Sequence, residues 1–144
     1  MSSLVTKSLT STRRTRRQAK RTAAATVELA LMIPLMLSIV LGSLEVCQRL
    51  MLRQGATVAA YETARLAARR GASTTRAIQR GESILNGRGI AGGQVTIAPG
   101  DISEVATGDN LTITVNVPIA GNTSIAYVLP SNGQISVSAN MLRE

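Results

Sequence analysis

The stretch that decides the fold is Ala23–Leu44, AAATVELALMIPLMLSIVLGSL, in which Glu28 is the only ionisable residue. An α-helix rises ~1.5 Å per residue, so these 22 residues extend ~33 Å, against a bilayer hydrocarbon core of ~30 Å. We therefore expect this stretch to cross a membrane as a helix, with Glu28 at the membrane's edge.

The charges on either side of this stretch are unequal. Residues 1–22 carry seven Lys and Arg and no acid, whereas the chain from Glu45 onward holds nine Arg and seven acids. A basic block before a span keeps the N-terminus in the cytoplasm and sends the following residues across. The sequence thus predicts a single-pass protein with its C-terminal part outside. A basic nucleic-acid arm and a mitochondrial transit peptide remain as alternatives for residues 1–22.

The composition excludes several functions. With 144 residues the chain forms about one domain, and it contains no His, one Cys and two Tyr. A His-based catalytic site, an intrachain disulfide and an aromatic platform for single-stranded nucleic acid are therefore excluded. A carboxylate enzyme would need two converging acids, but the outer acids lie in polar, turn-like stretches: Glu82, Asp101, Glu104 and Asp109. We predict a non-enzyme with no catalytic residues, cofactor, metal site or nucleic-acid partner.

The helix is expected to continue beyond the apolar stretch. No Pro lies between Glu45 and Ala72, and strong helix formers dominate there. We predict one helix from about Ala24 to Arg70, ended by Gly71. Glu45 is interpreted as a solvated residue that marks the end of the span, and a modest apolar stripe occupies one helix face: Cys47, Leu50, Met51, Val58 and Tyr61.

The remaining residues predict a short helix followed by strands. Residues 74–85 form the short helix, weakened by Gly81, and the GxGxxG pattern at 87–92 is a loop, because a helix precedes it and a strand follows. Period-two alternation predicts three half-buried strands, at 95–97, 111–117 and 135–141. Such alternation suits an antiparallel sheet with one wet face, covered on the other by the outer half of the long helix. The connector between Pro118 and Pro130 is expected to supply another cap, through Ile125, Tyr127, Val128 and Leu129.

Residues 21–72 resemble the TadE-like family of pseudopilins in the tight-adherence pilus system. The resemblance is carried, in order, by Ala24–Leu31 (AATVELAL), Pro34, Gly42–Glu45 (GSLE), Arg49, Arg53-Gln54, Ala59-Ala60 and Ala64-Arg65. The ending Ile135–Glu144 (ISVSANMLRE) is also similar to the ends of such proteins. The match is dense up to about residue 74 and looser beyond it.

The resemblance implies processing by prepilin peptidase, an aspartic membrane enzyme that cuts on the cytoplasmic side of the apolar segment. The family pattern has Glu at the fifth mature position, so Glu28 places the cut between Ala23 and Ala24. Ala23 departs from the family's usual Gly before the cut. The new amine at Ala24 would lie one helical turn from Glu28 and pair with it, in the same chain or a neighbour. Alternatively, Glu28 merely favours the first helical turn and extends to the interface.

Together these observations predict an α+β, pilin-like fold: a long N-terminal transmembrane helix continuing into a small outer domain with a short helix and a three-stranded antiparallel sheet. The expected parts are a basic cytoplasmic leader (1–23), the span (24–44), the outer continuation of the helix (45–72) and the outer domain (73–144).

The expected function is that of a minor pilin or pseudopilin needed to assemble a type IVc (Flp/Tad) pilus from the bacterial inner membrane. Its expected partners are other pilins, prepilin peptidase, the inner-membrane assembly platform and the lipid bilayer. The alternative is a signal-anchored, single-span protein with an extracytoplasmic binding domain that does not polymerise.

Overall fold

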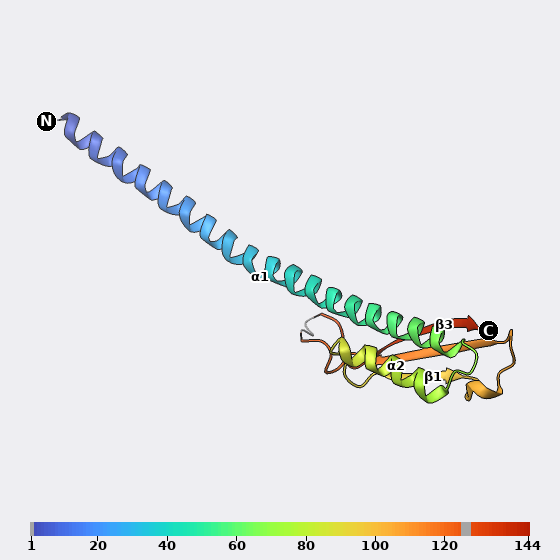
Figure 1. Cartoon of the computed structure of the whole chain (residues 1–144). Coiled ribbons are helices and arrows are strands. Elements are labelled where there is room, and N and C mark those ends of the chain that lie inside the picture. The colour runs from blue at the N-terminus through green and yellow to red at the C-terminus, as the bar shows by residue number, and fades with distance from the viewer. Residues whose placement is uncertain (1, 125–127) are drawn as a thin grey trace. The chain divides into compact units, whose positions relative to one another are not determined.

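The computed structural model describes residues 2–124 and 128–144, with the side chains of residues 22–124 and 128–144. It contains two compact units, Met1–Leu41 and Gly42–Glu144. The helix α1 (Ser2–Ala67), coloured blue to green in Figure 1, supplies the described part of the first unit and begins the second.

The first unit is helical throughout its described residues. Its large apolar side chains from Val27 to Val40 are each between 46% and 72% exposed. Among the described residues, one helical segment, Thr22–Ala67, is long and apolar enough to cross a membrane. A helix that exposes so much apolar surface needs lipid or protein around it. The predicted span is therefore confirmed as a candidate membrane helix of a single-pass, membrane-anchored protein.

The ends of α1 differ from the expected ones. The helix begins at Ser2 rather than near Ala24, because residues 2–33 contain neither Gly nor Pro and residues 13–21 (RRTRRQAKR) are mostly helix-favouring. It ends at Ala67 rather than Arg70. The turn that follows contains Gly71, whose φ of 72° is a left-handed conformation that favours glycine.

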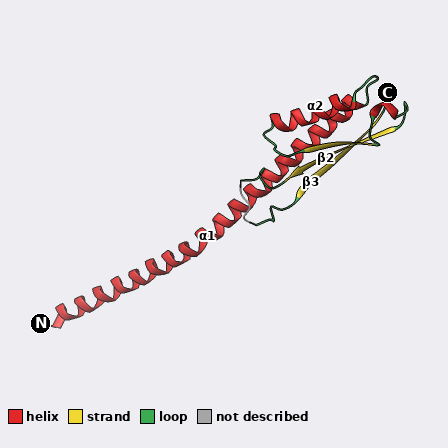
Figure 2. Cartoon of the chain, turned by 90° about the horizontal axis from the view of Figure 1, so that it is seen from below, coloured by secondary structure: helices red, strands yellow, loops and turns green. Residues whose placement is uncertain are grey.

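The second unit contains an antiparallel sheet of three strands in the order β1-β2-β3. These are β1 (Gln94–Ala98), β2 (Asn110–Pro118) and β3 (Gln134–Leu142), and they confirm the three strands predicted from alternation. Val115 of β2 stands opposite Val95 and Val137 on its two neighbours. The helix α2 (Thr74–Gly87) precedes the sheet, and the short 3-10 helix η1 (Ile102–Glu104) connects β1 to β2. Figure 2 shows α2 and the strands alongside the last part of α1.

The core forms where α1 covers the apolar face of β2. On β2 the core side chains, fully buried, are Leu111, Ile113, Val115 and Val117. They belong to one buried cluster with small side chains of α1: Ala56, Ala59, Ala60, Ala64 and Ala67. Alanine lets a helix approach a sheet closely, so this face excludes water with little side-chain volume. The opposite face of the sheet is hydroxyl-rich, with Thr114 Oγ1 and Ser138 Oγ 3.1 Å apart. The α+β class and the predicted cover of the sheet are confirmed.

The predicted apolar stripe of α1 lies on a different face. Cys47 is exposed, and so are the other four stripe residues, at 37% to 64%: Leu50, Met51, Val58 and Tyr61. The covering face is the alanine-rich one, which the sequence presented only as a run of helix formers. An apolar stripe therefore remains uncovered by the chain's own sheet.

Gly81 is a packing requirement and not a weakness of α2, which continues to Gly87. A Cβ atom at Gly81 would lie 2.4 Å from Thr63 Oγ1 of α1 and 3.0 Å from Val95 Cγ2 of β1. Both distances are shorter than van der Waals contact, so α2 can pack in its observed position only without a side chain here.

Gly81→Ala is expected to lower the free energy of unfolding by about 1–3 kcal/mol, because the new methyl group overpacks this contact. Gly87→Ala is the matched control, since nothing lies within 4 Å of its Cβ position. The control should change the same quantity by less than about 1 kcal/mol. Denaturant unfolding in detergent measures both, and equal midpoints for the two variants would contradict this account of Gly81.

The loops also bear on the sequence predictions. Residues 88–93 form a loop between α2 and β1, which confirms the interpretation of the GxGxxG pattern. In the connector after β2, Ile125 and Tyr127 lie outside the described residues, whereas Val128 and Leu129 are 63% and 37% exposed. No buried cap is therefore seen at these two described positions.

Asp101 ties η1 to the start of α2. Its Oδ1 accepts hydrogen bonds from Thr74 Oγ1 at 2.7 Å and from the Ser103 backbone N–H at 3.1 Å. The Thr74 bond, followed by the Ser103 bonds, holds the pKa of this carboxyl below its ordinary value of 3.8. Because the folded-state pKa is lowered, the stabilisation is complete above the unfolded value and is lost as the pH falls through the folded value.

Asp101→Ala is therefore expected to lower the thermal midpoint at pH 6, and the difference from wild type should shrink as the pH falls below about 4. Thermal scans monitored by circular dichroism at several pH values measure this. Glu82→Ala, which removes an exposed carboxylate on α2, is the control and should show no such convergence. A difference for Asp101→Ala that is constant down to pH 2 would contradict the linkage.

Candidate functional site

The predicted processing residues lie together on α1. Ala23, Ala24 and Glu28 are all helical and exposed, and the four-residue spacing places Ala24 and Glu28 on the same side of the helix. The Ala24 nitrogen is here a peptide nitrogen, so it carries no charge with which Glu28 could pair. Within the described part of the chain, the Glu28 carboxylate has no hydrogen bond or ion pair.

Glu45 is a buried carboxylate with several donors around it. Its side chain is fully buried, and its Oε2 accepts a hydrogen bond from the Val128 backbone N–H at 2.8 Å. Its Oε1 accepts one from the Leu129 backbone N–H at 3.1 Å and lies 3.2 Å from Arg49 Nη2. A charge removed from water is tolerated when ionic and backbone donors replace its hydration. Glu45 therefore holds the segment 128–129 against α1, more than 80 residues away in the sequence.

Arg49 completes this cluster, which we call the Glu45 anchor (Glu45, Arg49 and residues 128–130). One guanidinium nitrogen, Nη2, contacts Glu45 and also donates to the Pro130 carbonyl at 2.9 Å. The Arg49 side chain is 21% exposed, and its Nε is buried without a partner in the described part of the chain. Glu45 and Arg49 are four residues apart on α1, so one helical turn brings the two side chains together.

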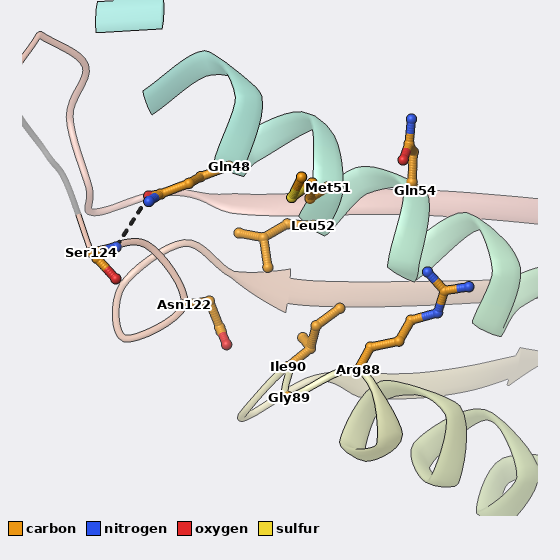
Figure 3. Close-up of a pocket in the computed structure, with 9 residues that line it drawn as sticks. All are labelled: Gln48, Met51, Leu52, Gln54, Arg88, Gly89, Ile90, Asn122 and Ser124. Carbon is orange, nitrogen blue, oxygen red and sulfur yellow. Dashed lines mark hydrogen bonds between the residues drawn. The ribbon is translucent and has the colours of Figure 1, made fainter. Parts of the chain in front are cut away.

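A groove of about 410 Å³ lies beside the anchor, between α1 and the loops at 88–90 and 122–124 (Figure 3). Leu52 of α1 and Ile90 of the first loop point toward one another across it. At one end Gln48 Oε1 accepts a hydrogen bond from the Ser124 backbone N–H at 3.1 Å. The described residues contain no group of three metal-ligating side chains. The groove thus offers an apolar floor with a polar edge.

Comparison with known proteins finds a match for the part of α1 that contains Glu28, Glu45 and Arg49. Residues 23–65 match the model of a family described as TadE-like protein. Over this segment the chain is similar to TadE-like proteins. The resemblance that the sequence suggested is thereby confirmed. No curated protein and no solved structure matches the chain.

The TadE-like segment contains Ala23, Ala24 and Glu28 near one end and Glu45 and Arg49 in its middle. The prediction that Glu45 is a solvated marker of the span's end is wrong, because the side chain is fully buried. The spacing to Arg49 was visible in the sequence. The backbone donors at 128 and 129 carry no side-chain signal and come from a distant loop, so sequence reasoning could not find them.

Glu45→Ala is expected to destabilise the outer unit by about 3–5 kcal/mol, because it leaves the Arg49 cation and two backbone N–H groups without their acceptor. Limited proteolysis should also cut residues 119–133 faster. Glu82→Ala, an exposed acid of α2, is the control and should stay within about 0.5 kcal/mol of wild type. Equal protection of the connector in Glu45→Ala and wild type would rule out the anchor's role.

Proposed function

We propose that this chain is a minor pilin or pseudopilin, a structural subunit that takes part in assembly of an adhesive type IVc (Flp/Tad) pilus. The observation that carries the proposal is the TadE-like match over residues 23–65, which covers the candidate membrane helix and its continuation. The small outer unit, with its sheet packed on the later part of α1, supports a subunit that joins a folded domain to an anchoring segment. In this proposal the chain performs no catalysis.

The first step of the proposed mechanism is removal of the basic leader. Prepilin peptidase would hydrolyse the peptide bond between Ala23 and Ala24, releasing seven positive charges that favour retention of the N-terminus in the cytoplasm. The same hydrolysis gives Ala24 a cationic amine. The bond lies within α1, so the enzyme must open the helix locally to reach it.

The second step uses Glu28. A carboxylate within the membrane is costly, at ~2.5–3.5 kcal/mol for central positions on insertion scales. The amine at Ala24 of a neighbouring subunit would offset this cost and favour the axial register in which both charges are paired. The lack of any partner for Glu28 in the described part of the intact chain supports a role that begins after cleavage.

The third step is transfer of the helix from lipid to protein. The exposed apolar side chains of α1 would exchange lipid contacts for contacts with the helices of other pilins, and small residues such as Gly42 and Ser43 would allow close approach. In this proposal the helix lies in the bacterial inner membrane beside the assembly platform, with the N-terminus cytoplasmic and the outer unit periplasmic or extracellular.

Glu28→Ala is expected to reduce recovery of partner pilins in mild detergent by about tenfold, because an apolar residue cannot pair with the Ala24 amine. Pull-down of the tagged chain with quantitative mass spectrometry measures this, and Glu82→Ala is the control with unchanged recovery. N-terminal sequencing of wild type should give Ala24. Ala23→Gly should increase the cleaved fraction, since it restores the family's residue before the cut.

An uncut chain that functions normally with Ala at position 28 would instead support the signal-anchored alternative, in which the outer unit binds a ligand without polymerising. Cleavage at Ala24 combined with unchanged partner recovery in Glu28→Ala would reject the pairing step alone.

A further inference from the structure

One face of α1 is apolar, exposed and turned away from the sheet. We call it the outer seam, and it consists of Leu44, Cys47, Met51, Gln54, Val58 and Tyr61. Leu44, Met51 and Tyr61 are 47%, 64% and 56% exposed. The sheet covers the opposite, alanine-rich face of the helix. A helix whose other face already forms a core would carry polar residues here if this face met only water.

The spacing of the outer seam is more specific than its hydrophobicity. Successive members lie three, four, three, four and three residues apart, which is the a/d pattern of a coiled coil. Along the sequence the same spacing continues toward the N-terminus through Val40, Leu37 and Ile33. A period of 3.5 residues keeps one stripe facing a second helix, whereas contact with lipid or water requires no such period.

We propose that the outer seam binds the outer seam of a second copy of this chain, in parallel orientation. Two copies anchored through the same apolar segment enter the membrane in the same direction, so their helices are parallel. In a parallel two-fold pair, identical positions meet. Gln54, the one amide in the seam, then meets Gln54 of the partner subunit, and each amide can donate to and accept from the other. An apolar partner would leave this amide unsatisfied.

The groove beside the seam suits the same partner. Leu50 flanks the seam and is 53% exposed. In a parallel pair, a residue at this flanking position lies next to the position five residues further along the other helix, which is Gly55. Gly55 lies beside Ile90 and Arg88, which line the groove together with Leu52. Leu50 of the partner subunit therefore enters the groove.

Gly55 lets Ile90 pack directly against α1 at the edge of the groove. A Cβ at Gly55 would lie only 2.5 Å from Ile90 Cδ1, so no side chain of its own fits between α1 and the groove floor. The groove's volume of about 410 Å³ accommodates a leucine side chain. The seam and the groove thus form one self-complementary surface. This pairing concerns the intact chain and depends on neither leader cleavage nor filament assembly.

Pairing through the outer seam can be tested with purified full-length protein in phosphatidylcholine vesicles, oxidised with copper phenanthroline. Cys47 is the only cysteine and lies in the seam, so two copies should form a disulfide-linked product of twice 15.1 kDa. Cys47→Ser combined with Gln54→Cys should give the same product. Cys47→Ser combined with Arg53→Cys is the matched control, because position 53 is exposed and outside the seam; its yield should be about tenfold lower.

Variants that retain Cys47 separate pairing from random collision. Val58→Glu opposes two carboxylates in the seam and should lower the disulfide yield about tenfold, whereas Arg53→Glu should not. Leu50→Ala should lower the yield, and Leu142→Ala, on exposed β3, should not. Circular dichroism checks that each variant keeps its helix and sheet.

Equal yields from positions 54 and 53, no product from either seam position, or an unchanged yield in Val58→Glu would overturn the proposal. Because the vesicles contain no peptidase and no other pilin, these outcomes are independent of whether the chain is cleaved or enters a pilus.

Discussion

The structure depends on burial of one sheet face by one face of α1. The apolar face of the three-stranded sheet is stabilised by burial, and here the helix that buries it is the same one that carries the apolar candidate span. Alanines at 56, 59, 60, 64 and 67 contribute to this because they form one buried cluster with the apolar side chains of β2. The outer unit is therefore built onto α1, and the sheet's apolar side chains would be exposed without it.

Local patterns were sufficient to predict the elements of the fold. Each of these elements has a pattern that can be recognised within its own residues: the apolar stretch 23–44, the three alternating segments and the short helix. What could not be predicted depends on distant contacts. Glu45 is buried because backbone donors at 128 and 129 return to it, and Gly81 is needed because Thr63 and Val95 lie against it. The candidate processing residues came from family resemblance and a charge pattern, and the structure shows that they are helical and exposed.

Glu28 and Glu45 show how the same residue type acquires opposite environments on one helix. Glu45 has a cation, Arg49, four residues after it. Glu28 would have one four residues before it if cleavage gave Ala24 a free amine. Glu45 has its partners in the intact chain and is buried. Glu28 is exposed and lacks a partner among the described residues. A carboxylate with a complete set of donors stabilises its own fold, whereas an exposed one without them can pair only with a charge that comes from elsewhere.

The Glu45 anchor also bears on which faces of α1 stay exposed and can bind partners. It fastens residues 128–130 to α1 at Glu45 and Arg49, which are not part of the outer seam. Side chains on the sheet side are then committed to the core, and those of the outer seam stay exposed. A helix with one face assigned to its own domain can bind other helices only through the opposite face. Such a helix needs small residues on the face that packs on its own sheet. It needs larger apolar side chains, at intervals of 3.5 residues, on the face that binds another helix.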